Sequence, residues 1–233
     1  MPPTSRVLAA TLAVALAIGC GKTPEPGDSG VSGGSSSGGG TGGGTVGSAT
    51  LPKRTPPTRE QLAAFQKRVR EAGFDRAAGG YGSVDETLPI YTSASGLVKD
   101  TDLSRFPEPP FEFGLNLTFA SLPAAKLDAL KPSPKLVYLR FQVEFGLQEE
   151  AVAVLARHTS LEELYIGSVG LKDTGVAHLK GLTRLRRLDL GGNAFTDAAG
   201  AHLTGLRDLE WLNLGGNGHV TEQVVRPSRG CEN

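Results

Sequence analysis

The sequence predicts an α/β fold made of stacked strand–helix units. Residues 161–217 repeat one phrase, which Leu161, Leu185 and Leu209 open at intervals of 24 residues. In each opening, leucines alternate with polar residues, which gives a short strand one apolar face. In each second half, apolar residues follow helical spacing. One unit buries little surface alone, so the units must stack, with neighbouring strands paired in parallel.

The repeated phrase has the form L-x-x-L-x-L-x-x-N, and T-D-x-x-G follows it at Thr196–Gly200. This resembles the leucine-rich-repeat family, in its 24-residue, ribonuclease-inhibitor-like bacterial form. The resemblance implies a short solenoid over residues 111–225, with a parallel concave sheet and convex helices. The asparagine of the family pattern is present as Asn193 and Asn217. The equivalent positions of other units hold Ala120, Glu144 and Val169, so we expect the earlier units to be less regular.

For residues 58–110 the sequence predicts an N-terminal helix followed by an irregular cap or degenerate repeat. Thr58 and Gln61 have the spacing of a capping box, and apolar residues follow at helical intervals up to Gly73. A basic amphipathic helix could instead lie on a membrane. We favour a cap, because the open end of a repeat array needs one. Residues 88–90 are a candidate strand of the degenerate repeat.

Residues 1–20 have the features of an export signal. Arg6 precedes an apolar run from Val7 to Ile18, which is too short to cross a bilayer as a helix. The run ends at Cys20 and resembles the lipobox of bacterial lipoproteins, although Ala17 stands where that pattern prefers leucine. The resemblance implies a lipid anchor on Cys20 and a place in the bacterial cell envelope. The alternative is an ordinary secretory signal and a secreted protein.

The sequence predicts that two further segments are disordered. Residues 21–57 are rich in Gly, Ser and Thr and have no apolar periodicity, which is typical of a flexible linker. Residues 226–233 form a polar tail that also lacks the repeat pattern. Since no C-terminal cap is recognisable, we expect the last unit to leave an apolar end exposed, where copies of the chain could self-associate.

Composition excludes some functions. Lys+Arg and Asp+Glu are both 24, so the basic face that a nucleic-acid ligand requires is not expected. The sequence contains no catalytic motif, and Cys20 and Cys231 stand too far apart to suggest a disulfide framework. His178 and His202 are equivalent residues without a third ligand. We therefore predict no enzyme, no metal and no cofactor.

The candidate binding surface consists of exposed strand positions between the leucines. Equivalent positions of neighbouring strands lie about 4.8 Å apart, so they form rows across the sheet. One row is Tyr138, Glu163, Arg187 and Trp211; the next is Arg140, Tyr165, Asp189 and Asn213. Aromatic residues and arginines often anchor interfaces. In the alternative interpretation these residues bind no ligand: they only keep the surface polar, and Glu163 pairs with Arg187 across strands.

These features together predict a non-catalytic protein–protein interaction module tethered in the cell envelope. Its ligand would be a protein or peptide bound by the concave face, as the family resemblance implies. The alternative is a structural envelope lipoprotein whose repeats associate with one another. The sequence favours the first, because anchor, linker and repeats together suit a surface held away from a membrane.

Overall fold

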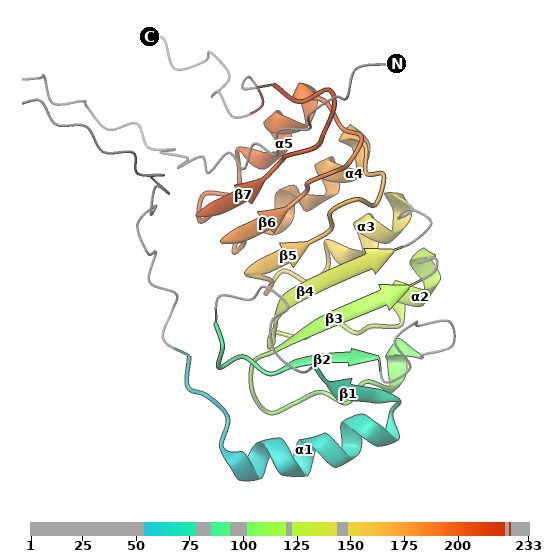
Figure 1. The fold of residues 1–233 in the computed structure, drawn as a ribbon, viewed down its shortest axis with the longest axis vertical. Helices are drawn as coiled ribbons and strands as arrows, with labels where there is room; N and C mark the ends of the chain where they lie inside the picture. Colours follow the sequence, from blue (N-terminus) through green and yellow to red (C-terminus); the bar gives the residue numbers. More distant parts are fainter. Residues whose placement is uncertain are drawn as a thin grey trace, which may run out of the picture.

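The computed structural model describes residues 54–77, 85–93, 102–119, 123–143, 149–221 and 224. They form one seven-stranded sheet whose strands follow chain order (Figure 1). The first two strands pair antiparallel, and every later pair is parallel. This alternation of strands and helices on a parallel sheet fits the predicted α/β fold.

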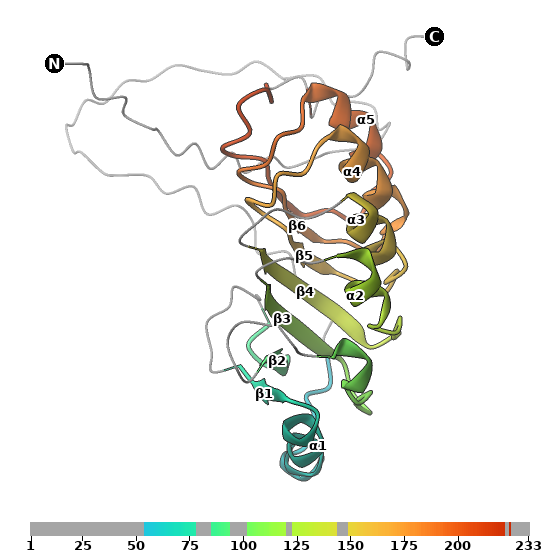
Figure 2. The same ribbon diagram turned by 90° about the vertical axis from the view of Figure 1, so that its right-hand side faces the viewer.

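The strands are β1 (Phe74–Arg76), β2 (Ile90–Ser93), β3 (Phe113–Phe119), β4 (Leu136–Val143), β5 (Glu163–Tyr165), β6 (Arg187–Asp189) and β7 (Trp211–Asn213). The α-helices are α1 (Arg59–Glu71), α2 (Ala124–Asp128), α3 (Glu149–Leu155), α4 (Asp173–Ala177) and α5 (Gly200–Leu203). Short 3₁₀ helices span Leu103–Arg105, His178–Gly181 and Asp197–Ala199. Figure 2 shows α2 to α5 on one side of the sheet. We call the opposite side the front face.

The repeated leucines build the core between the sheet and the helices, as predicted. The strand residues that point inward are fully or almost fully buried: Leu164, Ile166, Leu188, Leu190 and Leu212. From the helix side, Phe195, Leu203 and Leu206 are buried in the same cluster. Burying each such side chain stabilises the fold by about 1.5–3 kcal/mol, so stacking is what makes each short unit stable.

Asn193 joins two successive turns of the stack. Its side-chain oxygen accepts the backbone N–H groups of Val169 and Leu171 at 3.0 and 3.1 Å. Its amide donates to the carbonyls of Ile166 and Leu190 at 3.0 and 2.9 Å. Four backbone groups that leave the strand ladder are thereby satisfied inside the protein.

The earlier units differ from this pattern, as expected where the asparagine is missing. Strands β3 and β4 contain 7 and 8 residues, whereas β5 to β7 contain 3 each. The pairing of β3 with β4 also shifts register between Phe113 and Gly114. The regular geometry therefore belongs to the second half of the stack.

A second ladder lies on the helix side and involves Asp173, the Thr196-Asp197 dipeptide and Thr221. Asp173 accepts hydrogen bonds from the backbone N–H and the hydroxyl of Thr196, at 2.8 and 2.9 Å. One unit later, Asp197 accepts the same pair from Thr221 at 2.8 and 2.6 Å. Each aspartate thus holds the threonine of the following unit, an interaction that the sequence analysis did not predict.

Helix α1 caps the first end of the sheet. The Gln61 backbone donates to the Thr58 hydroxyl at 3.2 Å, and the Gln61 side chain accepts the Thr58 N–H at 2.8 Å, so the predicted capping box is present. Phe65 and Val69 are buried, and the Phe65 ring lies 5.4 Å from the Tyr91 ring of β2. The apolar side of α1 thus packs on the sheet, which is the contact that a cap requires.

The segment after α1 is more ordered than expected. It adds β1, which pairs antiparallel with β2 and was not predicted. The predicted strand at residues 88–90 begins only at Ile90, and Leu88 packs on the front face instead. Residues 106–110 form no helix or strand, in agreement with their proline content.

Arg54 corrects the predicted extent of the disordered linker. It falls inside residues 21–57, yet its side chain is only 6% exposed. Its guanidinium contacts Asp85 at 2.9 Å, Glu112 at 2.8 Å and Glu162 at 2.5 Å. These carboxylates precede β2, β3 and β5, so Arg54 joins the start of the described chain to the amino-terminal ends of these strands.

The broad apolar end that we expected after the last unit is not found among its described side chains. Leu206 is 1% exposed, Leu209 8% and Leu212 5%. Val224 is also buried, and its carbonyl approaches Gly200 so closely that an added Cβ would lie 2.2 Å from it. Leu214 and Val220 of the same unit are only partly buried, so self-association at this end stays a prediction.

The remaining terminal predictions lie outside the described residues. They are the signal peptide at 1–20 with Cys20, most of the linker, and the tail at 226–233 with Cys231. Among the described residues, no helix is both long and apolar enough to cross a membrane.

Replacing Arg54 by Ala should destabilise the fold by about 3 kcal/mol, because the mostly buried Asp85 loses its cation and Glu162 keeps only the exposed Arg184. Urea unfolding of the full-length chain measures this free energy. The control is Arg70→Ala: Arg70 pairs with Asp75 at 3.4 Å and both side chains are exposed, so it should cost less than about 1 kcal/mol. Equal losses for the two variants would contradict a structural role for Arg54.

Candidate interaction surface

The structure places the eight predicted surface residues in the two expected rows. Strand register pairs Tyr138 with Glu163, Glu163 with Arg187, and Arg187 with Trp211. It likewise pairs Arg140, Tyr165, Asp189 and Asn213 in sequence across β4 to β7. The repeat, with steps of 25 and then 24 residues, was sufficient to predict this arrangement, since equivalent residues of parallel strands become neighbours.

The expected exposure is wrong for three of the eight. Tyr138 is fully buried, Glu163 is 1% exposed and Tyr165 8%. The other five are partly exposed: Arg140, Arg187, Asp189, Trp211 and Asn213. The accessible part of the surface therefore lies mainly on β6 and β7.

Tyr138 belongs to a small second core on the front face. An added Cβ on Gly114 would lie 2.8 Å from the Tyr138 ring and 3.1 Å from Ile90, so the ring occupies the space above the glycine. Leu88 and Tyr165 complete the cluster. Burial raises the pKa of Tyr138 to about 12. We therefore assign Tyr138 to packing rather than to ligand binding.

Glu163 also has a partner inside the fold. The Tyr165 hydroxyl donates to its carboxylate at 3.0 Å, and both side chains are buried. Burial, together with the negative charge of Glu163, raises the pKa of Tyr165 well above its usual value. The predicted cross-strand ion pair between Glu163 and Arg187 is not among the ion pairs of the described residues.

Arg187 packs against the only tryptophan of the chain. Its guanidinium carbon lies 5.8 Å from the centre of the Trp211 ring, a cation–π arrangement. Its Nε is buried and has no hydrogen-bond partner among the described residues. A buried N–H without an acceptor costs about 1–3 kcal/mol.

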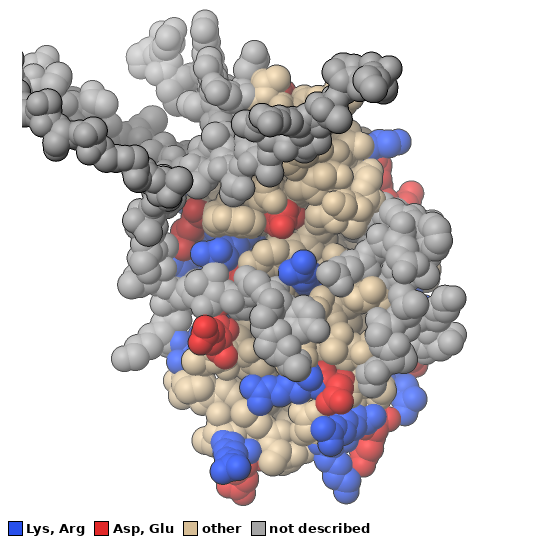
Figure 3. All heavy atoms as spheres, in the orientation of Figure 1, with Lys and Arg blue, Asp and Glu red and all other residues tan. Residues whose placement is uncertain are grey.

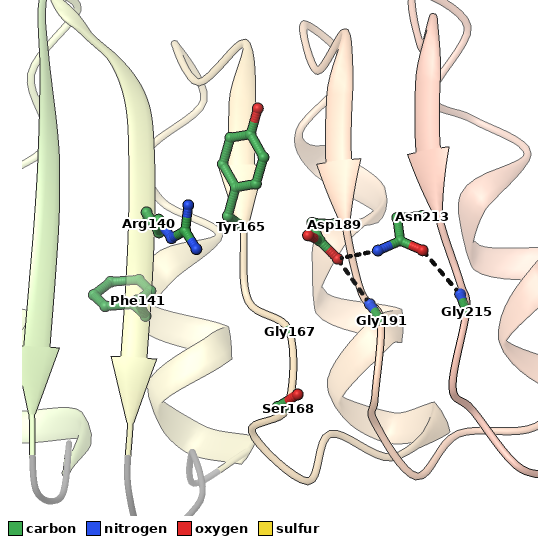
Figure 4. A pocket seen from close by; sticks show the side chains of 9 residues that line it. All are labelled: Arg140, Phe141, Tyr165, Gly167, Ser168, Asp189, Gly191, Asn213 and Gly215. Atoms are coloured by element: carbon green, nitrogen blue, oxygen red, sulfur yellow. Dashed lines mark hydrogen bonds between the residues drawn. The ribbon is translucent and has the colours of Figure 1, made fainter. Parts of the chain in front are cut away.

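A hollow of about 480 Å³ opens on the front face where β4 to β7 end (Figure 4). This volume lies within the range of ligand pockets, about 300–1,000 Å³. Its walls include Arg140, Tyr165, Asp189 and Asn213, and glycines of the following turns form much of the rest.

Two hydrogen bonds fix Asp189 beside this hollow. Its Oδ1 accepts the Gly191 backbone N–H and the Asn213 side-chain amide, both at 2.9 Å (Figure 4). The Asn213 oxygen in turn accepts the Gly215 N–H at 3.0 Å. Each side chain thus closes the turn that follows its own strand and is held rigidly in place.

The glycines of these turns were missed in the sequence analysis. Gly167, Gly191 and Gly215 all line the hollow and stand 24 residues apart. A Cβ on Gly191 would lie 2.8 Å from the Asn213 amide nitrogen, so a larger residue would displace the hydrogen bond to Asp189. Their repetition at the period of the leucines was the signal that could have revealed the hollow.

Charge on the described surface is mixed. Figure 3 shows basic and acidic side chains next to one another across the described front face. Just before β6 and β7, Arg186 donates to Glu210 of the next unit at 2.7 Å. Within the described ranges, no three His, Cys, Asp or Glu residues are grouped as a metal site would require. His178 is exposed and His202 partly so.

Comparison with known proteins bears on the regular half of the stack. Residues 159–218 match the family model described as leucine rich repeat. A search of curated proteins found no match. The matched segment includes β5 to β7 and therefore Arg187, Asp189 and Trp211. The leucine-rich-repeat family is generally a non-catalytic interaction fold that binds protein partners. The match, the period and the parallel strand–helix stack together support assigning this segment to a leucine-rich-repeat family.

Proposed function

We propose that the chain is a non-catalytic protein-binding module that uses the front face of β5 to β7. In this proposal the repeats form a short ribonuclease-inhibitor-like solenoid, and the front face is its concave side. One observation carries the proposal: Arg187 is held against Trp211, and both side chains are partly exposed on the front face. Arginine and tryptophan are the residue types that most often dominate binding energy at interfaces.

The division of the front face supports the same function. Tyr138, Glu163 and Tyr165 are buried and form a rigid base. Trp211 lies beside this base, with its ring 6.3 Å from the Tyr165 ring. A partly exposed aromatic residue on a packed support loses little conformational entropy when a partner covers it. The half-buried residues of β6 and β7 are therefore the expected contact residues.

Arg187→Ala and Trp211→Ala should each weaken binding of the natural partner by at least about 30-fold, the effect of a typical hot-spot residue. The measurement is affinity capture from an envelope extract with the immobilised full-length chain, followed by quantitative mass spectrometry. Lys180→Ala is the matched control, because Lys180 is exposed in the 3₁₀ helix that follows α4 on the helix side. If both front-face variants captured as much partner as the wild type, the proposal would fail.

We further propose that lipid on Cys20 anchors the module in the bacterial cell envelope. The sequence features at residues 1–20 support this, and the Gly-rich segment supports a flexible tether. Because Arg54 is fixed to the fold, the tether would run from Cys20 to residue 53 and span about 30 Å on average. Such a tether holds the binding face away from the membrane while limiting its search volume.

Mass spectrometry of the mature N-terminus tests the anchor. The expected result is a chain that begins at Cys20 with acyl chains on that residue and sediments with membranes. Cys20→Ala should abolish the lipid and release the chain from the membrane fraction. A mature N-terminus elsewhere, or an unmodified Cys20, would favour the secreted alternative.

A further inference from the structure

Strand β6 presents two opposite charges side by side on the front face. Arg187 and Asp189 are two residues apart in one strand, so their side chains point to the same side, about 6.8 Å from each other along the strand. Both are partly exposed. They form no ion pair with each other.

The Asp189 carboxylate is held in place with one oxygen unused by the fold. Oδ1 accepts both of the hydrogen bonds that position the side chain. No donor among the described residues contacts Oδ2. The side chain borders the hollow, whose opposite wall carries Arg140 on β4, about 10 Å away in backbone spacing. A cation that enters the hollow would therefore be attracted by the Asp189 carboxylate and repelled by the Arg140 guanidinium.

The Arg187 guanidinium complements this arrangement. It forms no ion pair with any described residue, and its side chain is partly exposed. Trp211 supports it from β7 and limits its rotamers. Arginine binds carboxylates with a planar, two-donor geometry, which suits an acidic side chain or another carboxylate of a partner.

We propose that Arg187 and Asp189 together recognise an extended peptide segment with one acidic and one basic side chain two residues apart. The inference rests on the proposed function and names the chemistry of the partner at that site. The acidic group binds Arg187 beside Trp211, and the basic group enters the hollow to reach Asp189. In an extended peptide, residues i and i+2 lie on one face about 6.8 Å apart, which matches the spacing along β6.

The arrangement also selects against other segments. Two acidic groups at this spacing would place one carboxylate against Asp189, and two basic groups would place one cation against Arg187. Like charges in partly desolvated positions are strongly unfavourable. Adjacent acidic and basic residues would point to opposite sides of an extended chain, so only one of them would reach the pair.

Two synthetic peptides of the same composition test the spacing. The first is acetyl-Ala-Glu-Ala-Lys-Ala-amide, and the second is acetyl-Ala-Ala-Glu-Lys-Ala-amide, which places the charges next to each other. Titration calorimetry with the full-length chain should show the first to bind about tenfold more tightly, a difference expected for one partly buried charge contact. The fluorescence of Trp211, the only tryptophan, should change on the same titration.

Charge-removing variants then assign each contact. Asp189→Asn keeps an oxygen for the Gly191 N–H, so the turn should remain intact. This variant should bind the Glu-Ala-Lys peptide about tenfold more weakly than the wild type does, but its affinity for a Glu-Ala-Gln peptide should be unchanged. Arg187→Gln should show the complementary result: it should bind Glu-Ala-Lys more weakly, and its affinity for Gln-Ala-Lys should be unchanged. Circular dichroism of each variant checks the fold.

The outcomes separate this inference from the proposed function. If the wild type bound both isomers and the uncharged peptides equally, the charge pairing would be wrong while a peptide-binding face remained. If no peptide bound but affinity capture still depended on Arg187 and Trp211, the extended charged segment would be wrong and the module function would stand. If capture were also independent of Arg187 and Trp211, both the charge-pairing inference and the proposed protein-binding function would be wrong.

Discussion

The in-register pairing of parallel strands is the constraint on which the rest of the structure depends. It converts a 24-residue period in sequence into side-by-side residues in space, on both faces of the sheet at once. The ladder continues past the strands: Ser168 and Gly192 donate to the carbonyls of Gly191 and Gly215, each at 2.8 Å. Because those turns also stack, their glycines lie in line and shape the hollow.

The same pairing gives the front face two different halves. Toward β3 and β4, Tyr138 lies over Gly114 and packs with Leu88 and Ile90 from before the repeats and with Tyr165 from the next strand. That half is a second core and contributes stability. Toward β6 and β7, Arg187 and Asp189 keep polar atoms that the fold itself does not satisfy. Both side chains are partly exposed, so this half has the polar groups that the proposed binding function uses.

The sequence alone was enough to predict what depends on the period. The two rows of surface residues, the buried leucines and the asparagine at position 193 all follow from equivalence at 24 residues. The capping box of α1 was also predictable, because its two partners stand only three residues apart.

What could not be predicted depends on contacts between distant or irregular segments. Arg54 gathers carboxylates that are 31, 58 and 108 residues away in the chain, and no local pattern marks such a cluster. The burial of Tyr138 requires Leu88 and Ile90, which lie outside the repeats. Strand β1 has three residues, too few to show a periodicity. Exposure on the front face was therefore misjudged wherever a non-repeating segment packs onto it.

Hydrogen exchange tests most directly whether β6, β7 and the turns after them form the binding face. Backbone amides of the full-length chain would be compared with and without its captured partner. The account predicts slower exchange on binding in residues 187–192 and 211–216, with little change in residues 173–181 and 197–204 on the helix side. Protection confined to the helix side, with none in β6 and β7, would contradict it.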